Sequence, residues 1–482
     1  MKLSAVKILI LLAVTLVAPS VMAVDIYVDS GGSNTSPYDT WEKAATTIAT
    51  AQSASSSGDV IYISGGASTK TYTGQIVGKA GVSFKAGALS ASPSGHDGIV
   101  ILAYVGNEGI YSNANNVVVD GYSSGTQKIR VTTSSSGVTI TGAVTGNVLR
   151  GIEITGPTNG ISINTGAVEI SYCYIHDLAL DSDRAIYANT PGGTAYGTIS
   201  VHHNTIEAWN DPDRAGTGAD GIQANANISI YNNTIRSIAN VDYSEAQHND
   251  AIQMGEGSYV KIYNNELSGW TSYGMYLEFS NDNVYIYNNY IWGSRNAIDC
   301  GGQDDRDNWY ILNNTIADCI NDTPVAGIRI YNANDTKVLS NFNIENNIIV
   351  NCPGAAISAA DGNYTCGAHG SEVGMIVDYN VHVAGAAGSN SVVCDGGTYS
   401  QTHDGGTTQP TFVTYSAGGG AANDLSLAAG DMVAQNTGVS FSAVFTTDIL
   451  GTTRSASWDI GAYEYYEQGS IHGITSMGVS KK

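Results

Sequence analysis

The sequence predicts an all-β fold, a single-stranded right-handed parallel β-helix (solenoid) with a short N-terminal capping helix. Two short elements alternate through the middle of the chain, and both show the alternation of apolar and polar residues that is typical of strands. No segment between them has helical periodicity, so parallel neighbours must come from successive coils of one solenoid. The 57 glycines and 29 tyrosines among 482 residues agree, because many short strands joined by tight turns favour this composition.

The first element is a strand that ends in an asparagine turn and then returns to the core. Apolar residues occupy its first, third and eighth places, and its copies start 24 to 33 residues apart, which places the length variation in loops. The copies are VEISYCYI at Val168, ISVHHNTI at Ile199, ISIYNNTI at Ile228, VKIYNNEL at Val260, VYIYNNYI at Val284, WYILNNTI at Trp309 and FNIENNII at Phe342.

The asparagines of the first element predict a ladder along the stack. Asparagine tolerates a left-handed backbone, and its amide can donate and accept between coils. The predicted ladder contains Asn204, Asn233, Asn265, Asn289, Asn314 and Asn347. We expect a structural role for these residues rather than ligand binding, and likewise for His202 and His203 in the same element.

The second element supplies another strand to each coil and a candidate glycan-binding face. Its copies are NGISIN at Asn159, RAIYAN at Arg184, DGIQAN at Asp220, DAIQMG at Asp250, YGMYLE at Tyr273, NAIDCG at Asn296 and AGIRIY at Ala326. Alternation predicts an outward column of small residues and, beside it, an outward polar column. The polar column contains Ser162 and the candidate substrate-binding residues Tyr187, Gln223, Gln253, Tyr276, Asp299 and Arg329. The two columns predict a shallow groove lined by groups that bind sugars, and the alternative is an inert surface.

The candidate catalytic residues follow the longest insertions. Arg184, Asp220 and Asp250 end three insertions at equivalent places on adjacent coils, roughly 5 Å apart along the stack. His248 stands two residues before Asp250 and can act as acid or base near neutral pH. The four side chains are expected to converge on one solvent-facing site. The alternative is that they are ordinary solvated turn residues.

The same insertions contain a candidate calcium site. Asp181 with Asp183, and Asp211 with Asp213, form two D-x-D pairs. Ca²⁺ takes several oxygen ligands in irregular geometry, so these pairs could bind it. A strongly acidic chain also produces such pairs by chance.

The two ends of the chain predict export and capping. Residues 1–23 resemble a signal peptide, with two lysines, an apolar run too short for a membrane helix and small residues before Val24. Helical spacing of apolar residues between Trp41 and Ala51 predicts a helix that caps the first coil. We expect one domain over 24–464, including an irregular closing segment, then a tail over 465–482. The protein is expected to be secreted or on the cell surface, and monomeric.

The net charge narrows the possible binding partners. The net charge is −23, and loss of the leader's two lysines would make it −25, which argues against nucleic acid or an anionic membrane as a binding partner.

Cys319 and Cys352 each lie ten residues after their repeat starts, so stacking predicts a disulfide between them. Cys366 and Cys394 form a weaker candidate pair, and two further cysteines are expected to be free, Cys173 and Cys300.

The chain resembles the secreted pectate-lyase-like β-helix superfamily in three features: the coils, the asparagine turns and the ending DILGTTRSASWDIGAYE from Asp448. The resemblance implies the fold and an extracellular polysaccharide as partner. It does not fix the chemistry, because members include lyases, hydrolases, epimerases and proteins without activity. The hydrolase pattern is matched only in part, by Asp304, Asp305 and Arg329, without a Gly-His-Gly between them.

The favoured expectation is a lyase that cleaves a uronic-acid glycan by β-elimination. Ca²⁺ or Arg184 would offset the uronate carboxylate, and His248 or an arginine would remove the C5 proton. One alternative is a glycoside hydrolase that uses Asp220 and Asp250 as acid and base. The other alternative is a non-catalytic adhesion protein that only binds the glycan.

Overall fold

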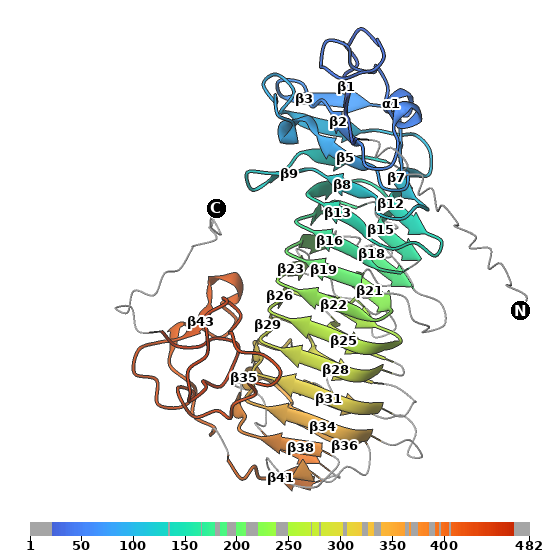
Figure 1. Cartoon of the computed structure of the whole chain (residues 1–482). Helices are drawn as coiled ribbons and strands as arrows, with labels where there is room; N and C mark the ends of the chain where they lie inside the picture. Colours follow the sequence, from blue (N-terminus) through green and yellow to red (C-terminus); the bar gives the residue numbers. More distant parts are fainter. Residues whose placement is uncertain are drawn as a thin grey trace, which may run out of the picture.

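A computed structural model shows a long stack of coils with a C-terminal segment lying beside its later part (Figure 1). The described residues are 22–133, 135–164, 166–178, 184–189, 199–208, 220–237, 249–270, 272–278, 281–301, 306–320, 326–331, 339–361, 366–367, 375–384, 391–394, 397–403 and 406–466.

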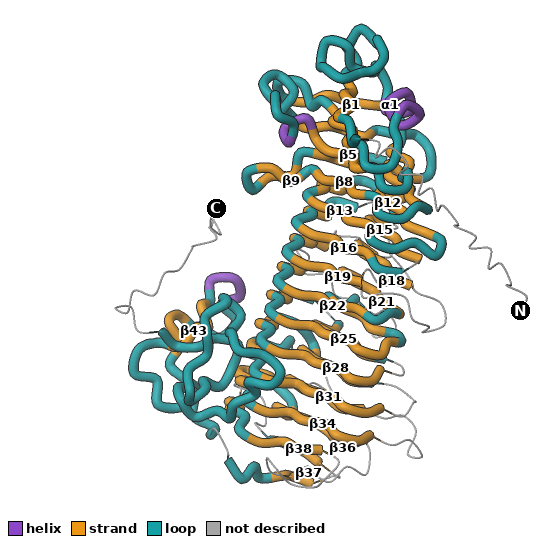
Figure 2. The backbone as a smooth tube through the Cα atoms, in the orientation of Figure 1, coloured by secondary structure: helices purple, strands orange, loops and turns teal. Residues whose placement is uncertain are grey.

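Three parallel sheets run along the stack, and each regular coil adds one strand to each sheet (Figure 2). The first sheet contains β1 (Asp25–Val28), β2 (Val60–Ile63), β5 (Ser83–Ala86), β8 (Val118–Asp120), β13 (Asn147–Arg150), β16 (Val168–Ser171), β19 (Ile199–His202), β22 (Ile228–Tyr231), β25 (Gly257–Tyr263), β28 (Asn281–Tyr287), β31 (Arg306–Leu312), β34 (Leu339–Glu345), β38 (Met375–Asp378) and β37 (Cys366–Gly367). The second sheet contains β3 (Thr69–Tyr72), β6 (Ile99–Leu102), β11 (Ile129–Val131), β14 (Ile152–Ile154), β17 (Tyr174–Ile175), β20 (Thr205–Ala208), β23 (Thr234–Ser237), β26 (Glu266–Ser268), β29 (Tyr290–Trp292), β32 (Thr315–Ala317), β35 (Ile348–Cys352) and β39 (Val381–Ala384).

The third sheet carries the second sequence element. It contains β4 (Ile76–Val77), β7 (Glu108–Ser112), β12 (Ser136–Thr141), β15 (Asn159–Asn164), β18 (Arg184–Asn189), β21 (Asp220–Asn225), β24 (Ile252–Met254), β27 (Tyr273–Leu277), β30 (Asn296–Cys300), β33 (Ala326–Tyr331), β36 (Ala355–Asp361), β40 (Val392–Cys394) and β41 (Gly397–Tyr399). The predicted register is confirmed, since Ile222 pairs with Ile252 and Gln223 with Gln253. The predicted β-helix is therefore confirmed, with a third strand per coil that forms where the first element re-enters the core.

The core is a continuous column of branched aliphatic side chains inside the coils. Ile222, Ile252 and Ile298 are fully buried, as alternation predicted for the inward places of the third sheet. Each inward side chain stacks on an apolar side chain of the next coil, such as Ile252 on Met275, which removes both surfaces from water. Among the described residues, no helix is long and apolar enough to cross a membrane.

The asparagine ladder is confirmed, and the two asparagines of each pair have different roles in the turn. The first of the pair takes the left-handed backbone, with φ of 55° at both Asn232 and Asn264. The second is buried: the Asn233 backbone N–H and side-chain amide both donate to Oδ1 of Asn265, at 3.1 and 3.0 Å. The Asn233 amide also donates to the Val201 carbonyl at 2.9 Å, so the turn's buried backbone groups are satisfied from coil to coil.

The N-terminal cap has a shorter helix than predicted. Helix α1 (Ile48–Ala54) begins after Thr47, whose hydroxyl accepts from the Thr50 backbone N–H at 3.1 Å. Ala45 does not join it, because its backbone is paired with strand β1 through the Tyr27 carbonyl and the Asp29 N–H. Strand pairing has thus replaced the first predicted turn. Short 3₁₀ turns occur at η1 (Gly87–Leu89) and η2 (Gly420–Ala422), and antiparallel pairs at β9 (Tyr122–Ser123) with β10 (Thr126–Gln127) and β42 (Phe412–Thr414) with β43 (Asp424–Leu427).

Both predicted disulfides are present. Cys319 and Cys352 stand on adjacent coils with their α-carbons 4.6 Å apart, and Cys366 is bonded to Cys394. Cys173 is free and buried, and Cys300 is buried and belongs to neither disulfide. Burial raises the pKa of the Cys173 thiol to about 12, so this thiol is inert at neutral pH.

The closing segment, residues 406–466, lies against the side of the coils instead of covering their end (Figure 1). Its apolar residues bury outward side chains of the second sheet. That cluster contains Tyr290, Ala317, Ile348, Val350, Val381, Phe412, Leu425, Leu427, Ala434 and Ile460.

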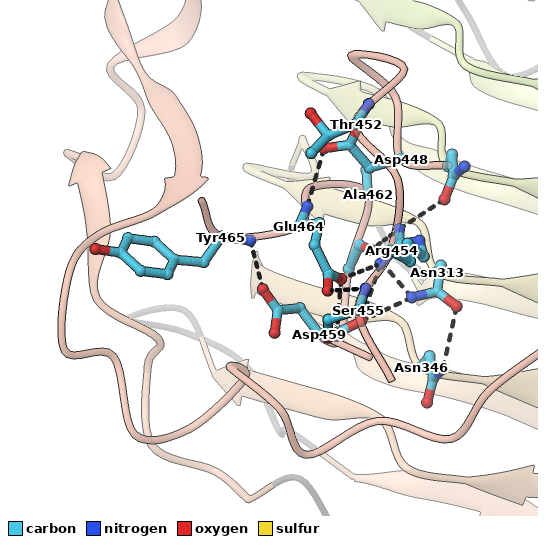
Figure 3. Close-up of polar contacts among 12 residues, drawn as sticks. Asn313, Asn346, Asp448, Thr452, Arg454, Ser455, Asp459, Ala462, Glu464 and Tyr465 are labelled. Carbon is cyan, nitrogen blue, oxygen red and sulfur yellow. Dashed lines mark hydrogen bonds and ion pairs between the residues drawn. The ribbon is translucent and has the colours of Figure 1, made fainter. Parts of the chain in front are cut away.

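A buried arginine fixes this segment to the asparagine turns (Figure 3). Arg454 donates from Nη2 to Oδ1 of Asn288 at 2.8 Å and forms an ion pair with Glu464 at 3.2 Å. The Asn313 amide donates to the Asp459 carbonyl at 2.9 Å. Burial raises the pKa of Asp459 to about 6. The DIGAYE-type ending therefore has a structural role, in which its polar groups recognise the left-handed asparagines.

Replacing Ile252 by Ala should lower the free energy of unfolding by about 2 to 5 kcal/mol, because a fully buried side chain leaves a cavity. The matched variant Gln253→Ala removes a half-buried, outward side chain and should cost at most about 1 kcal/mol. Urea unfolding of both variants measures the contrast. Equal losses at the two positions would contradict the strand register.

Replacing Asn265 by Ala should be more damaging than its neighbour's replacement, Asn264→Gly. Asn265 accepts from the Asn233 backbone and amide and donates to the Ile230 carbonyl. Its truncation would leave these buried polar groups without partners, at a cost of about 1 to 3 kcal/mol in the free energy of unfolding for each group. Gly at 264 keeps the left-handed backbone and should change stability by under roughly 1 kcal/mol. Similar unfolding midpoints for the two variants would show that the ladder does not stabilise the turns.

Candidate functional site

The outward polar column of the third sheet lies where the sequence predicts it. Strand pairing aligns its members across consecutive coils, each directly above the last. The column is Ser162, Tyr187, Gln223, Gln253, Tyr276, Asp299 and Arg329. All are half-buried except Asp299, whose exposed fraction is 1%.

Hydrogen bonds link the middle of the column. The Gln223 amide donates to the Gln253 side-chain oxygen at 2.5 Å, and the Gln253 amide donates to Glu278 at 3.3 Å. Glu278 stands two residues after Tyr276 and continues the outward alternation, a signal that sequence reasoning missed. These contacts orient amide and carboxylate groups on an accessible face.

The lower part of the column is a charged cluster. Asp299 accepts from the Asn296 amide at 2.7 Å and from the Arg329 guanidinium at 3.4 Å. Arg329 keeps 21% of its side chain exposed, whereas Asp299 keeps 2%. The buried carboxylate therefore holds a guanidinium that still faces solvent.

Aromatic rings complete the face. Tyr273 and Tyr276 stack with ring centroids 4.8 Å apart, and burial raises the pKa of Tyr273 to about 12. Burial, with the charges of Glu278 and Asp299, also raises the pKa of Tyr276, so this phenol stays protonated at neutral pH and can donate a proton or hydrogen bond. The Arg184 guanidinium lies over the Tyr187 ring, 4.3 Å from its centroid.

Asp220 and Asp250 occupy adjacent coils as expected, but they do not face solvent. Their exposed fractions are 6% and 0%. Asp220 accepts the Asp250 backbone N–H at 3.1 Å, and Asp250 accepts the Tyr273 N–H at 3.2 Å. Asn296 continues the pattern by accepting the Ala326 N–H at 2.9 Å. The expectation of a solvent-facing carboxylate pair is therefore wrong, because both side chains share the inward parity of Ile222 and Ile252 and accept backbone N–H groups at the bend where the chain enters the sheet.

The same bend corrects the predicted column of small residues. Gly221 and Ala251 are buried, and a Cβ on Gly221 would lie 2.6 Å from the Ala251 carbonyl and 2.8 Å from Ile235. Close backbone packing explains why this place is small. It is part of the interior corner and does not form the floor of a groove.

Several candidates lie outside the described residues. These are His248 and the D-x-D residues Asp181, Asp183, Asp211 and Asp213, together with Asp304 and Asp305. Their roles stay predictions. In the described part of the chain, no group of three or more His, Cys, Asp or Glu is placed to hold a metal ion.

The pKa of Asp250 provides a test of the buried bend. Burial and the neighbouring charge of Asp220 raise its pKa well above the usual value, so the protonated form is favoured in the folded state. Its contribution to stability is complete below the unfolded pKa of about 3.9 and is lost as pH rises through the folded pKa. Asn at 250 should retain the acceptor, as Asn296 does, without that loss. Urea unfolding from about pH 4 to about pH 8 should therefore show a stability gain for Asp250→Asn that grows with pH.

The Asp307→Asn variant is a control for which the expected pH dependence of stability has the opposite sign. Hydrogen bonds from Ser340 and Asn341 lower the pKa of Asp307, so its ionised form is the stabilising one. This variant should lose stability relative to the natural protein as pH rises. A pH-independent effect at Asp250 would contradict the buried, destabilised carboxylate.

A comparison with protein-family models agrees with the fold. A family model described as a right-handed β-helix region matches residues 222–373, and no curated protein sequence matches the chain. The Dettilon tailspike protein is 16% identical, over 76% of this chain and 66% of its own, with a TM-score of 0.42. Pectate lyase Pel9A is 15% identical, over 92% of this chain and 97% of its own, with a TM-score of 0.42. The PL6 family alginate lyase AlyGC is 11% identical, over 90% of this chain and 60% of its own, with a TM-score of 0.46. In fold, the chain is a right-handed parallel β-helix protein.

Proposed function

We propose that this is a secreted, polysaccharide-active protein that binds its glycan along the outward face of the third sheet. The observation that carries the proposal is the aligned column from Tyr187 to Arg329, in which every residue is polar and all but the buried Asp299 are partly exposed. The coil step is about 4.8 Å, so an extended sugar chain along the stack meets a new hydrogen-bonding group at each step. Amides, phenols and a guanidinium suit hydroxyl and carboxylate groups.

The favoured substrate is a glycan that contains uronic acids. Two guanidinium groups, from Arg184 and Arg329, border the face and can pair with sugar carboxylates. Arg329 is already oriented by the buried Asp299, so less side-chain freedom is lost on binding. The net charge of −23 makes such local cations important, because the rest of the surface repels a polyanion.

The favoured reaction is β-elimination. A guanidinium beside the uronate carboxylate acidifies the C5 proton, and a base removes that proton. The electron pair forms the C4–C5 double bond, the C4–O bond breaks, and the departing oxygen takes a proton. We assign the base role to His248 and the proton-donor role to Tyr276, whose raised pKa keeps it protonated.

Calcium would add positive charge next to the substrate carboxylate. The D-x-D pairs at Asp181, Asp183, Asp211 and Asp213 are our candidates for its ligands. Activity should then fall on treatment with a calcium chelator and return with added Ca²⁺.

A non-catalytic carbohydrate-binding role is the second candidate, and a specific observation favours it. The side chains of the column hydrogen-bond one another, and Asp220 and Asp250 are buried in the bend. The same burial disfavours a glycoside hydrolase that uses these two aspartates as acid and base.

One assay separates the three functions. The purified protein is incubated with a panel of uronate polymers, and ultraviolet absorbance of unsaturated products and the release of reducing ends are followed. A lyase raises both signals, a hydrolase raises only reducing ends, and a binder raises neither but slows its migration in a gel containing the polymer. Absence of all three signals across the panel would overturn the proposal.

Two variants of the face should weaken glycan recognition without unfolding the protein. Arg329→Ala and Gln253→Ala should each lower activity or binding at least about tenfold, because each removes groups that contact sugar. The matched control is Lys261→Ala, an exposed cation on the first sheet, which should keep full activity. Full activity in both face variants, or an equal loss in the control, would place the glycan elsewhere.

A further inference from the structure

Two adjacent histidines interrupt the repeat at the end of strand β19 (Figure 1). In the following coils, the place of His202 is held by tyrosine and the place of His203 by asparagine. These equivalents are Tyr231, Tyr263 and Tyr287 for the first place, and Asn232, Asn264 and Asn288 for the second. His203 keeps the left-handed backbone of its asparagine counterparts, with φ of 55°. The fold therefore accepts the repeat's own residues here, and the ladder does not require histidine.

The two imidazoles converge. Their Nδ1 atoms lie 2.8 Å apart, and the ring planes are inclined by 84°. Each imidazole ring also stacks on a tyrosine ring of an adjacent coil. His202 stacks on Tyr231 at 4.7 Å, and His203 stacks on Tyr172 at 4.9 Å.

The far nitrogens have polar partners of their own. Nε2 of His202 lies 3.4 Å from the Glu169 carboxylate, and Nε2 of His203 lies 3.3 Å from the side-chain amide of Asn232. A carboxylate that accepts from the far nitrogen is the arrangement that orients histidine ligands of metals and increases their basicity. It places the proton of His202 on Nε2 and leaves a lone pair on Nδ1. Burial lowers the pKa of both histidines, although Glu169 partly opposes this for His202, so both rings are neutral at neutral pH.

We propose that the Nδ1 atoms of His202 and His203 form a two-imidazole site for a divalent transition metal ion, with copper(II) preferred. With metal–nitrogen bonds of about 2.0–2.1 Å, nitrogens at this separation subtend about 85–90° at the ion. That angle suits neighbouring positions of a square-planar or octahedral ion and is too small for tetrahedral zinc. Without metal, one proton lies between the two nitrogens, donated by His203. On metal binding that proton moves to Nε2 of His203, where the Asn232 side-chain oxygen can accept it after an amide rotation.

The site is separate from the proposed glycan face, since β19 belongs to the first sheet. His202 and His203 are both only partly buried, and we assign the remaining coordination positions of the ion to water or to ligand oxygens. Metal binding at this site can therefore be tested independently of the proposed glycan activity.

The test is a titration of the purified protein, without a histidine tag and pretreated with chelator, with copper(II) and then nickel(II) salts. Calorimetry gives stoichiometry and affinity, and electron paramagnetic resonance of the copper(II) form reports nitrogen ligands. The informative variant is His202→Tyr with His203→Asn, because the following coils carry these two residues at the same places and the fold should be retained. The control for adventitious histidine binding is His176→Gln, at a residue directly after strand β17 of the second sheet.

We expect one tight copper(II) equivalent with two coordinated nitrogens, weakened at least about tenfold in the double variant and unchanged in His176→Gln. Glu169→Gln should weaken binding by about tenfold, as loss of an orienting partner does. Equal affinity in the natural protein and the double variant would place the copper elsewhere. No binding above that of the double variant would show that the histidines form only a hydrogen bond with each other.

Discussion

The fold depends on the satisfaction of buried backbone groups where each coil turns from the first sheet into the second. A turn buried between two neighbours cannot reach water, and an unsatisfied amide there would cost about 1 to 3 kcal/mol. From Asn204 to Asn380 the ladder asparagine satisfies these groups; for example, Asn289 accepts the Asn265 N–H and donates to the Ile262 carbonyl. The ladder ends when Asn380 passes its hydrogen bonds to Gln401. Coil length can then vary freely in the insertions without disturbing the stack.

The left-handed asparagine that precedes each ladder residue has a different use. Its side chain points out of the turn, and at Asn288, Asn313 and Asn346 the closing segment binds to it. A regular polar edge thus recognises an irregular segment, with Arg454 buried at the contact. Three coils nearer the N-terminus than Asn288, the same edge carries His203, and there it faces Asn232 and the neighbouring histidine. One turn geometry therefore provides both a docking edge and a candidate metal site.

Much of the fold could be predicted because it is periodic. The repeat spacing predicted the ladder, the third-sheet column and the Cys319–Cys352 disulfide, all of which follow from one coil stacking on the next. Alternation failed at Gly221, which is buried beside Ile222 although period two places it outward. Asp220 and Asp250 share the inward parity of Ile222 and Ile252, so alternation accounts for their burial, and the expectation that they face solvent rested on their place at the ends of insertions. The docking of the closing segment was also missed. It depends on contacts between residues more than a hundred positions apart, such as Asn288 with Arg454, for which local pattern carries no signal.

The proposed glycan face combines rigid support with accessible groups, and the position of the substrate on this face is what most needs to be tested. The most direct measurement is a crystal structure of the protein with a bound uronate oligosaccharide. The account predicts sugar density along the third sheet, with a carboxylate within hydrogen-bond distance of Arg329 or Arg184 and hydroxyls near Gln253 and Tyr276. Density on the first or second sheet, with the third-sheet column free, would contradict it.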